Sequence, residues 1–132
     1  MSEDQSDTGW EARLADRRRR YLLYCLHLYA PPLKLADVAH QLTVWETGEP
    51  ADDRLDERLR IYMSLYHDHL PALIDSRLVD YRQDEDVVGP GPATERIEPL
   101  LKRALRADAA DLLRAERAAF DRERDGRAGA LR

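Results

Sequence analysis

The chain has 132 residues, which is enough for one domain and one additional element. Charged residues make up 36% of it, and 26 Asp and Glu against 21 Lys and Arg give a net charge of −5. This charge excludes a surface that attracts polyanions as a whole, so any contact with nucleic acid must come from local patches.

The first predicted helix runs from Trp10 to Tyr29, because its apolar residues recur at spacings of three, four and seven. Residues 1–9 before it are acidic and polar and predict a disordered tail rather than a secretory signal. Four arginines, Arg17–Arg20, lie within the helix. Pro31 and Pro32 end it.

A second, shorter helix is predicted from Lys34 to Trp45, and the turn-forming residues 46–53 predict a loop after it. Asp52 or Asp53 can cap the third helix, which is predicted from about Asp53 to Ser76. The expected buried stripe of this third helix is Leu55, Leu59, Tyr62, Tyr66, His69 or Leu70, and Leu73.

Pro71 falls inside the third helix and cannot donate to the carbonyl of His67, so it should bend or break the helix there. After Arg77 the period changes to that of strands. Residues 78–82 and 87–88 predict a β-hairpin around a turn at 83–86, and GPGP at 89–92 predicts a linker.

The last predicted helix covers residues 93–122, with Thr94 as its cap, and residues 123–132 are expected to fray. The predicted fold is therefore mostly α with a small β-hairpin. Three helices and a hairpin over residues 10–90, followed by a C-terminal helix, is the layout of a winged helix-turn-helix. The connection between its second and third helices is longer than usual.

The segment HDHLPALIDSRLV at 67–79 resembles the end of the recognition helix in the ArsR-type winged-helix family. That family's pattern is Ser-x-His-Leu-x-x-Leu, a short run, and Gly-Leu-Val. His67 stands at the serine position and Arg77 at the glycine position, where a positive φ costs a non-glycine residue about 1 kcal/mol. The matching residues are His69, Leu70, Leu73, Leu78 and Val79.

The chain is also similar to small haloarchaeal winged-helix domains of uncharacterised function. The similarity rests on RRRRYLLYCL at 17–26, on Trp45-Glu46 and on SLYHDHLPALIDSRLVDY at 64–81, and covers about residues 10–90. It implies the fold and a regulatory role. Of the 21 basic residues 19 are arginine, and 16 Asp stand against 10 Glu. This bias suits a salt-loving host, and a genome rich in GC would also produce it.

Several classes of site are not expected. The single cysteine, Cys25, excludes an internal disulfide and predicts a buried, inert thiol. His67 and His69 are two residues apart, so their side chains diverge by about 200° on a helix and cannot share a metal unless the helix unwinds, which leaves a metal-responsive regulator as the weakest alternative. No phosphate-binding loop or nucleophile motif is present, so we expect neither an enzyme nor a cofactor. No apolar run is long enough for a membrane span, which indicates a cytoplasmic protein.

The functional hypothesis is a transcriptional regulator that binds double-stranded DNA. The outward side of the third helix should carry Arg60, Ser64, His67 and Asp68, which can contact bases or phosphates. Arg82 is the cation nearest the acidic hairpin tip at 83–86.

Arg18 and Arg19 form a second candidate patch, for phosphate. Their alternative role is in salt bridges to Asp16 and other carboxylates. The last helix predicts a homodimer, because paired half-sites need two-fold symmetry. The alternative function is a winged-helix module that binds proteins and never touches DNA.

Overall fold

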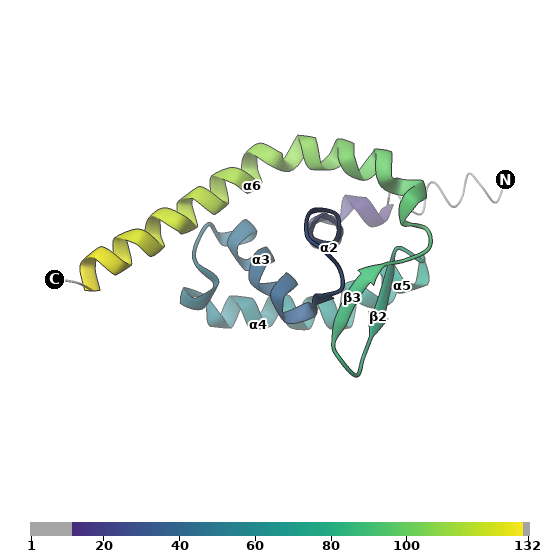
Figure 1. Cartoon of the computed structure of the whole chain (residues 1–132), viewed down its shortest axis with the longest axis horizontal. Helices are drawn as coiled ribbons and strands as arrows, with labels where there is room; N and C mark the ends of the chain where they lie inside the picture. Colours follow the sequence, from purple (N-terminus) through teal and green to yellow (C-terminus); the bar gives the residue numbers. More distant parts are fainter. Residues whose placement is uncertain (1–11, 131–132) are drawn as a thin grey trace.

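The computed structural model describes residues 12–130 of the chain (Figure 1). The disordered tail predicted for residues 1–9, and Trp10, lie outside the described residues. Residues 12–15 are helical, and Asp16 separates this short helical segment from the helix that follows. The Asp16 side chain then caps α2 (Arg17–Leu28) by accepting the Arg19 backbone N–H at 3.2 Å.

Helix α2 lies at the centre of the fold, where Figure 1 views it end-on, with α6, α3, the hairpin and the third helix around it. Its six consecutive residues from Tyr21 to Leu26 are all buried, as expected for a helix that is covered on every side. Cys25 is among them, and burial raises the pKa of its thiol to about 12. The prediction that Cys25 is buried is thus confirmed.

The second helix, α3, spans Leu35–Thr47 and ends at Gly48, which has a φ of 68°. The two residues before it, Leu33–Lys34, form strand β1, although the sequence predicted that the helix would begin at Lys34. Strand β1 pairs with β3 (Val87–Pro90), which pairs in turn with β2 (Val79–Arg82), so the antiparallel sheet has the order β1-β3-β2. A two-residue strand has no periodicity of its own, and only its partner β3 defines it.

The third helix is continuous from Leu55 to Asp75 and consists of α4 (Leu55–Ser64), the π-helical turn η2 (Leu65–His69) and α5 (Leu70–Asp75). Pro71 therefore does not break it. The Leu70 N–H bonds to the Leu65 carbonyl, one residue further back than in an α-helix. The expected cap by Asp52 or Asp53 is wrong, because both lie in a 3-10 turn (Ala51–Asp53) and α4 begins without a side-chain cap.

The buried face of the third helix also differs from the predicted stripe. Leu55 and Leu59 are exposed, whereas Ile61 and Leu65 are completely buried. His69 and Leu70 are both buried, because the π turn adds a residue to the inward side. The helix therefore carries two apolar rows. The row with Ile61 and Leu65 faces α2 and α3 and is buried in the core, whereas the row with Leu55 and Leu59 is exposed.

The third helix ends with the positive φ that was predicted for Arg77. Arg77 adopts a φ of 61°, and the Leu78 N–H bonds to the Leu73 carbonyl at 2.9 Å, which closes the helix in the left-handed conformation. Gly91 packs directly on this turn. A Cβ at Gly91 would lie 2.3 Å from the Arg77 carbonyl oxygen, so only glycine fits there.

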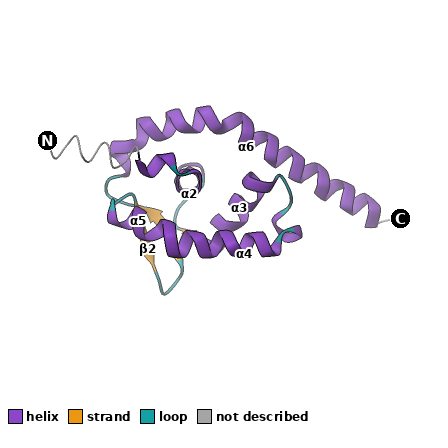
Figure 2. Cartoon of the chain, turned by 180° about the vertical axis from the view of Figure 1, so that it is seen from behind, coloured by secondary structure: helices purple, strands orange, loops and turns teal. Residues whose placement is uncertain are grey.

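Helix α6 (Thr94–Ala130) crosses above α2 and then continues beyond the α3–α4 connection, as Figures 1 and 2 both show. Ile97, Leu101 and Leu112 of α6 are buried in the same core as α2 and α3. Its first half therefore completes the domain. Residues 123–130, which were expected to fray, are part of the helix.

The observed fold is mostly helical, with a small antiparallel sheet and a long C-terminal helix, as predicted. The order helix, strand, helix, helix, two strands, helix is compatible with a winged helix-turn-helix.

Candidate functional site

The third helix and the neighbouring hairpin form the face of the molecule opposite α6 (Figure 2). The predicted base-reading residues lie along this helix. Arg60 has a side chain that is 74% exposed and makes an ion pair with Glu57 at 3.4 Å. His67 and Asp68 are exposed in the π turn, and Ser64 is half-buried. The structure thus brings these four residues onto one helix.

His67 and His69 have different environments, as their spacing predicted. His67 is exposed and its ring meets that of Tyr66 edge-on, with 5.1 Å between ring centroids. His69 is buried and accepts a hydrogen bond at its Nδ1 from Arg19 Nε at 3.1 Å. Burial lowers the pKa of His69, which favours the neutral ring that this bond requires. Within residues 12–126 no three His, Cys, Asp or Glu side chains are grouped as metal ligands.

Arg18 lies between helices. Its Nε bonds Glu46 Oε2 at 3.0 Å and its Nη2 bonds Glu46 Oε1 at 3.0 Å, while Glu57 lies 3.8 Å away. The hydrogen bond to Glu46 raises the pKa of Arg18 above its already high value. Glu46 is 5% exposed, so its contact with Arg18 is largely shielded from water. With Glu57 nearby, this contact links α2 to α3 and α4.

The other arginines of this run are also bound within the fold. Arg17 pairs with Glu46 at 3.2 Å, and Arg20 pairs with Asp108 of α6 at 2.9 Å. Asp108 also accepts the Tyr24 hydroxyl at 2.7 Å. Arg18 is therefore engaged through Nε and Nη2 by Glu46, and Arg19 through Nε by His69, so these donors are not free for a phosphate.

The hairpin presents one exposed cation and an acidic tip. Arg82 has a side chain that is 75% exposed and lies 4.0 Å from Glu85. Asp86, in contrast, turns inward with a φ of 53°. Its carboxylate accepts the hydroxyl of Tyr81 at 2.5 Å on Oδ1 and that of Tyr62 on Oδ2.

The bond from Tyr62 attaches the hairpin to the third helix, whereas the bond from Tyr81 lies within the hairpin. The hydrogen bond to Asp86 raises the pKa of Tyr62 to about 12, and burial together with Asp86 raises the pKa of Tyr81. The Asp86 carbonyl also accepts the Leu35 N–H at 2.9 Å, at the start of α3. Asp86 therefore has a structural role that its neighbours Asp84 and Glu85 lack.

The third helix also exposes an apolar row, two members of which, Leu55 and Leu59, were predicted to be buried. Leu55, Leu59 and Met63 are 62%, 61% and 42% exposed. Leu55 and Leu59 line a shallow hollow with Ala36, Ala39, Arg58 and Tyr62. Their spacing of four residues parallels that of the buried Ile61 and Leu65, so periodicity alone could not separate the two rows.

The sequence model of one protein family, described as a domain of unknown function (DUF7344), matches residues 12–89. No curated protein matches the chain, and no solved structure matches it. No helix in the described part of the chain has the length and apolar character that crossing a bilayer requires.

Proposed function

The chain belongs to the family described as a domain of unknown function (DUF7344), and we propose that it is a transcriptional regulator whose third helix reads double-stranded DNA. The observation that carries this proposal is the continuous helix Leu55–Asp75, exposed along one side beside a hairpin. An α-helix of this kind fits the major groove of B-DNA. Arg60 and His67 stand two turns apart on its exposed side.

Arg60 is the residue that we expect to discriminate bases. Its guanidinium can donate two hydrogen bonds to the O6 and N7 of guanine. Arg60 itself is 74% exposed, so its ion pair with Glu57 contributes little energy and can be exchanged for DNA. His67 can donate to a base or a phosphate, and Asp68 can accept from cytosine.

The phosphate contribution should be small. Arg18 and Arg19 have partners inside the fold, and the hairpin tip carries Asp84 and Glu85 beside Arg82. Few released counterions mean a shallow dependence of affinity on salt. Binding would then depend on base contacts, and it would persist in a salt-rich cytoplasm.

We propose that the regulator acts as a homodimer. The second half of α6 continues beyond the α3–α4 connection, and two of its apolar side chains, Leu113 and Phe120, are each 63% exposed. Two-fold symmetry would place two third helices on paired half-sites.

The test is a selection on random DNA duplexes by the intact chain, carried out at low salt and in concentrated potassium chloride. Enrichment of a palindromic motif at both salt concentrations is the expected result. No enrichment at either concentration would reject DNA reading.

A second candidate function follows from the apolar row Leu55, Leu59 and Met63. These side chains lie on the helix that should read DNA, and exposed rows of apolar residues mark protein-binding surfaces. In this case the domain binds a protein partner and no DNA. Leu59→Glu would abolish the partner's binding, whereas Arg60→Ala would change it little.

A further inference from the structure

The π turn of the third helix has a local cause in Pro71. In an α-helix the ring of Pro71 would collide with the carbonyl of His67, and a proline has no N–H to bond that carbonyl. The wider turn η2 relieves this conflict, and the Leu70 N–H bonds the Leu65 carbonyl instead. His69 carries the adjustment, since its φ of −95° departs from the value of about −63° in a regular α-helix. The turn therefore places His69 and Leu70 inward together, just after the exposed His67.

A hydrogen bond between side chains ties this turn to α2. His69 is buried, and its Nδ1 accepts from Arg19 Nε at 3.1 Å. Within residues 12–126, no other group makes a hydrogen bond to this ring. Because Nδ1 accepts, the ring is neutral and carries its proton on Nε2. The contact between α2 and the turn thus depends on the protonation state of one histidine.

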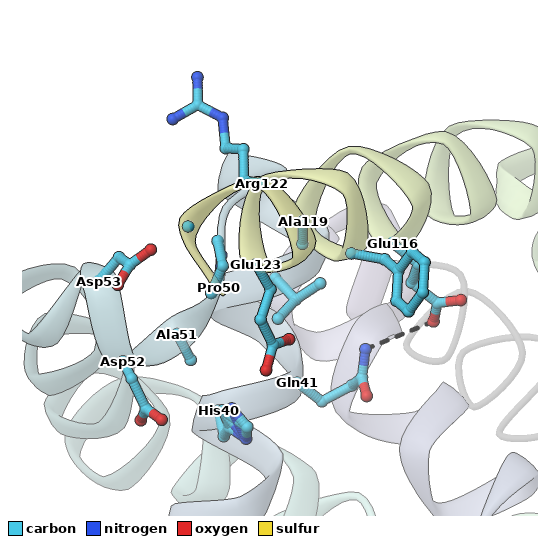
Figure 3. A pocket seen from close by; sticks show the side chains of 13 residues that line it. His40, Gln41, Pro50, Ala51, Asp52, Asp53, Glu116, Ala119, Arg122 and Glu123 are labelled. Carbon is cyan, nitrogen blue, oxygen red and sulfur yellow. Dashed lines mark hydrogen bonds between the residues drawn. The ribbon is translucent and has the colours of Figure 1, made fainter. Parts of the chain in front are cut away.

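The other three histidines of the chain are exposed, in contrast to His69. His40, for example, lines the groove between α3, α6 and the 3-10 turn, where its ring makes no hydrogen bond to the other labelled residues (Figure 3). A proton on such a ring breaks no buried contact. Among the histidines, His69 is therefore the one that couples protonation to packing.

A second partner for the His69 ring lies close by. Asp16 Oδ1 is 3.8 Å from the same Nδ1. The charged groups that face the ring are Asp16, Arg18 and Arg19 from α2 and its cap, and Asp68 from its own helix. Burial lowers the pKa of His69 most and the two arginines lower it further, whereas the two aspartates oppose this shift. The fold thus favours the neutral ring and keeps a carboxylate beside it.

We propose that protonation of His69 exchanges its partner Arg19 for Asp16, releases the π turn from α2, and thereby weakens DNA binding by the third helix. A proton taken up from water at Nδ1 points an N–H at the N–H of Arg19, so this hydrogen bond is lost and two positive charges face each other. The imidazolium then donates to Asp16. His67 and Asp68, beside the ring in the turn, lose the fixed position that favours base contacts. This inference rests on the proposed DNA reading and specifies how that reading is regulated.

The direction of the effect follows from the form that binds. Because the pKa of folded His69 lies below the ordinary value, the neutral ring predominates above about pH 6.5 and is lost as the pH falls below that value. Affinity for DNA should therefore be highest at neutral pH and fall on acidification. By reciprocity, bound DNA should make His69 harder to protonate.

The conformational part is tested without DNA, by hydrogen exchange of the intact chain between about pH 7.5 and about pH 5. The Leu70 N–H reports on the turn directly, because it donates to the Leu65 carbonyl. On acidification we expect its protection factor to fall by about tenfold or more, and that of the amides of α2 to change less.

Two variants separate the steps. The amide oxygen of His69→Gln can accept from Arg19 but takes up no proton, so its Leu70 protection should not depend on pH. Asp16→Asn is the matched control for the partner exchange. Asparagine still caps α2 but offers the imidazolium no charge, so the loss of protection should begin at a lower pH. Circular dichroism melting at neutral pH establishes that both variants are folded.

The coupling to DNA is measured by fluorescence anisotropy with the selected duplex at the same pH values. Wild-type affinity should fall by about tenfold at the lower pH relative to that of His69→Gln. Equal pH dependence in the two proteins would reject the regulation of DNA binding.

Constant Leu70 protection in the wild type would overturn the exchange of partners, and so would a loss that persists unchanged in His69→Gln. A simultaneous loss at every amide would also overturn it, because the protein would then unfold as a whole. The exchange measurement is independent of the DNA selection. A chain that enriches no duplex but loses Leu70 protection as expected removes DNA reading and leaves the switch in place.

Discussion

Arg18 binds both carboxylate oxygens of Glu46, across the junction of α2 and α3 and within 3.8 Å of Glu57 on α4. The pair is largely shielded from water, since Glu46 is 5% and Arg18 is 27% exposed. If Arg18 were removed, the Glu46 carboxylate would lose a favourable ion pair but would still pay the free-energy cost of its burial. The arginine run that looked like a phosphate-binding patch thus links three helices.

The first prediction is that Arg18→Ala lowers the free energy of unfolding by about 2 kcal/mol, because Glu46 would remain buried without its bidentate partner. Arg17→Ala is the matched control. Arg17 pairs with the same carboxylate from a position that is 57% exposed, so its loss should cost below about 1 kcal/mol. Urea unfolding followed by circular dichroism measures both. Equal losses for the two variants would contradict this role for Arg18.

The second prediction concerns the attachment of the hairpin through Asp86. Asp86→Asn keeps a residue that tolerates a positive φ but offers a single acceptor oxygen to two tyrosine hydroxyls. We expect it to destabilise the fold by about 1–2 kcal/mol and to speed hydrogen exchange in β2 and β3. Asp84→Asn, at the exposed tip, should stay within about 0.5 kcal/mol. If the two substitutions behave alike, the attachment does not stabilise the hairpin.

The third prediction concerns DNA. Arg60→Ala and His67→Ala should each weaken binding to the selected duplex by about 1–3 kcal/mol if each contact is good, and should relax specificity at one position. Arg103→Ala is the control, because Arg103 is exposed on α6, the helix that lies opposite the third helix in Figure 2. Fluorescence anisotropy with the selected and a scrambled duplex separates the two effects. An equal loss on both duplexes would mean that Arg60 contacts phosphate and reads no base.

The fourth prediction is a pH dependence of stability from His69. Burial lowers its pKa below the ordinary value of 6.5, so the unfolded chain binds the proton more readily than the folded one. The stabilisation is complete above about pH 6.5 and is lost as the pH falls through and below that value. His69→Gln should flatten the fall in unfolding free energy below pH 6.5. Denaturant titrations across this range give the slopes, and a steep fall that persists in His69→Gln would assign it to other groups.

The sequence alone determined the features that depend on neighbouring residues in the chain. The change of period after Arg77 gave the end of the third helix and the start of the hairpin, and Arg77 has the positive φ that the glycine position implied. A spacing of two residues placed His67 outside and His69 inside. Helical periodicity, strand alternation and turn chemistry are local properties, so the printed sequence contains them.

The tertiary structure decided every choice between equivalent local patterns. Leu55 and Leu59 follow the same period as Ile61 and Leu65, and only the packing of α4 on α2 and α3 selected the row that is buried. The partners of Arg17–Arg20 come from α3, the π turn and α6, up to 88 residues away in the chain. In the sequence, Asp86 does not differ from the other acidic residues of the hairpin tip. Only the fold brings Tyr62 of the third helix to its carboxylate. Burial and ion pairing depend on contacts between segments that are distant in the chain. Local sequence patterns do not determine which of these segments come into contact.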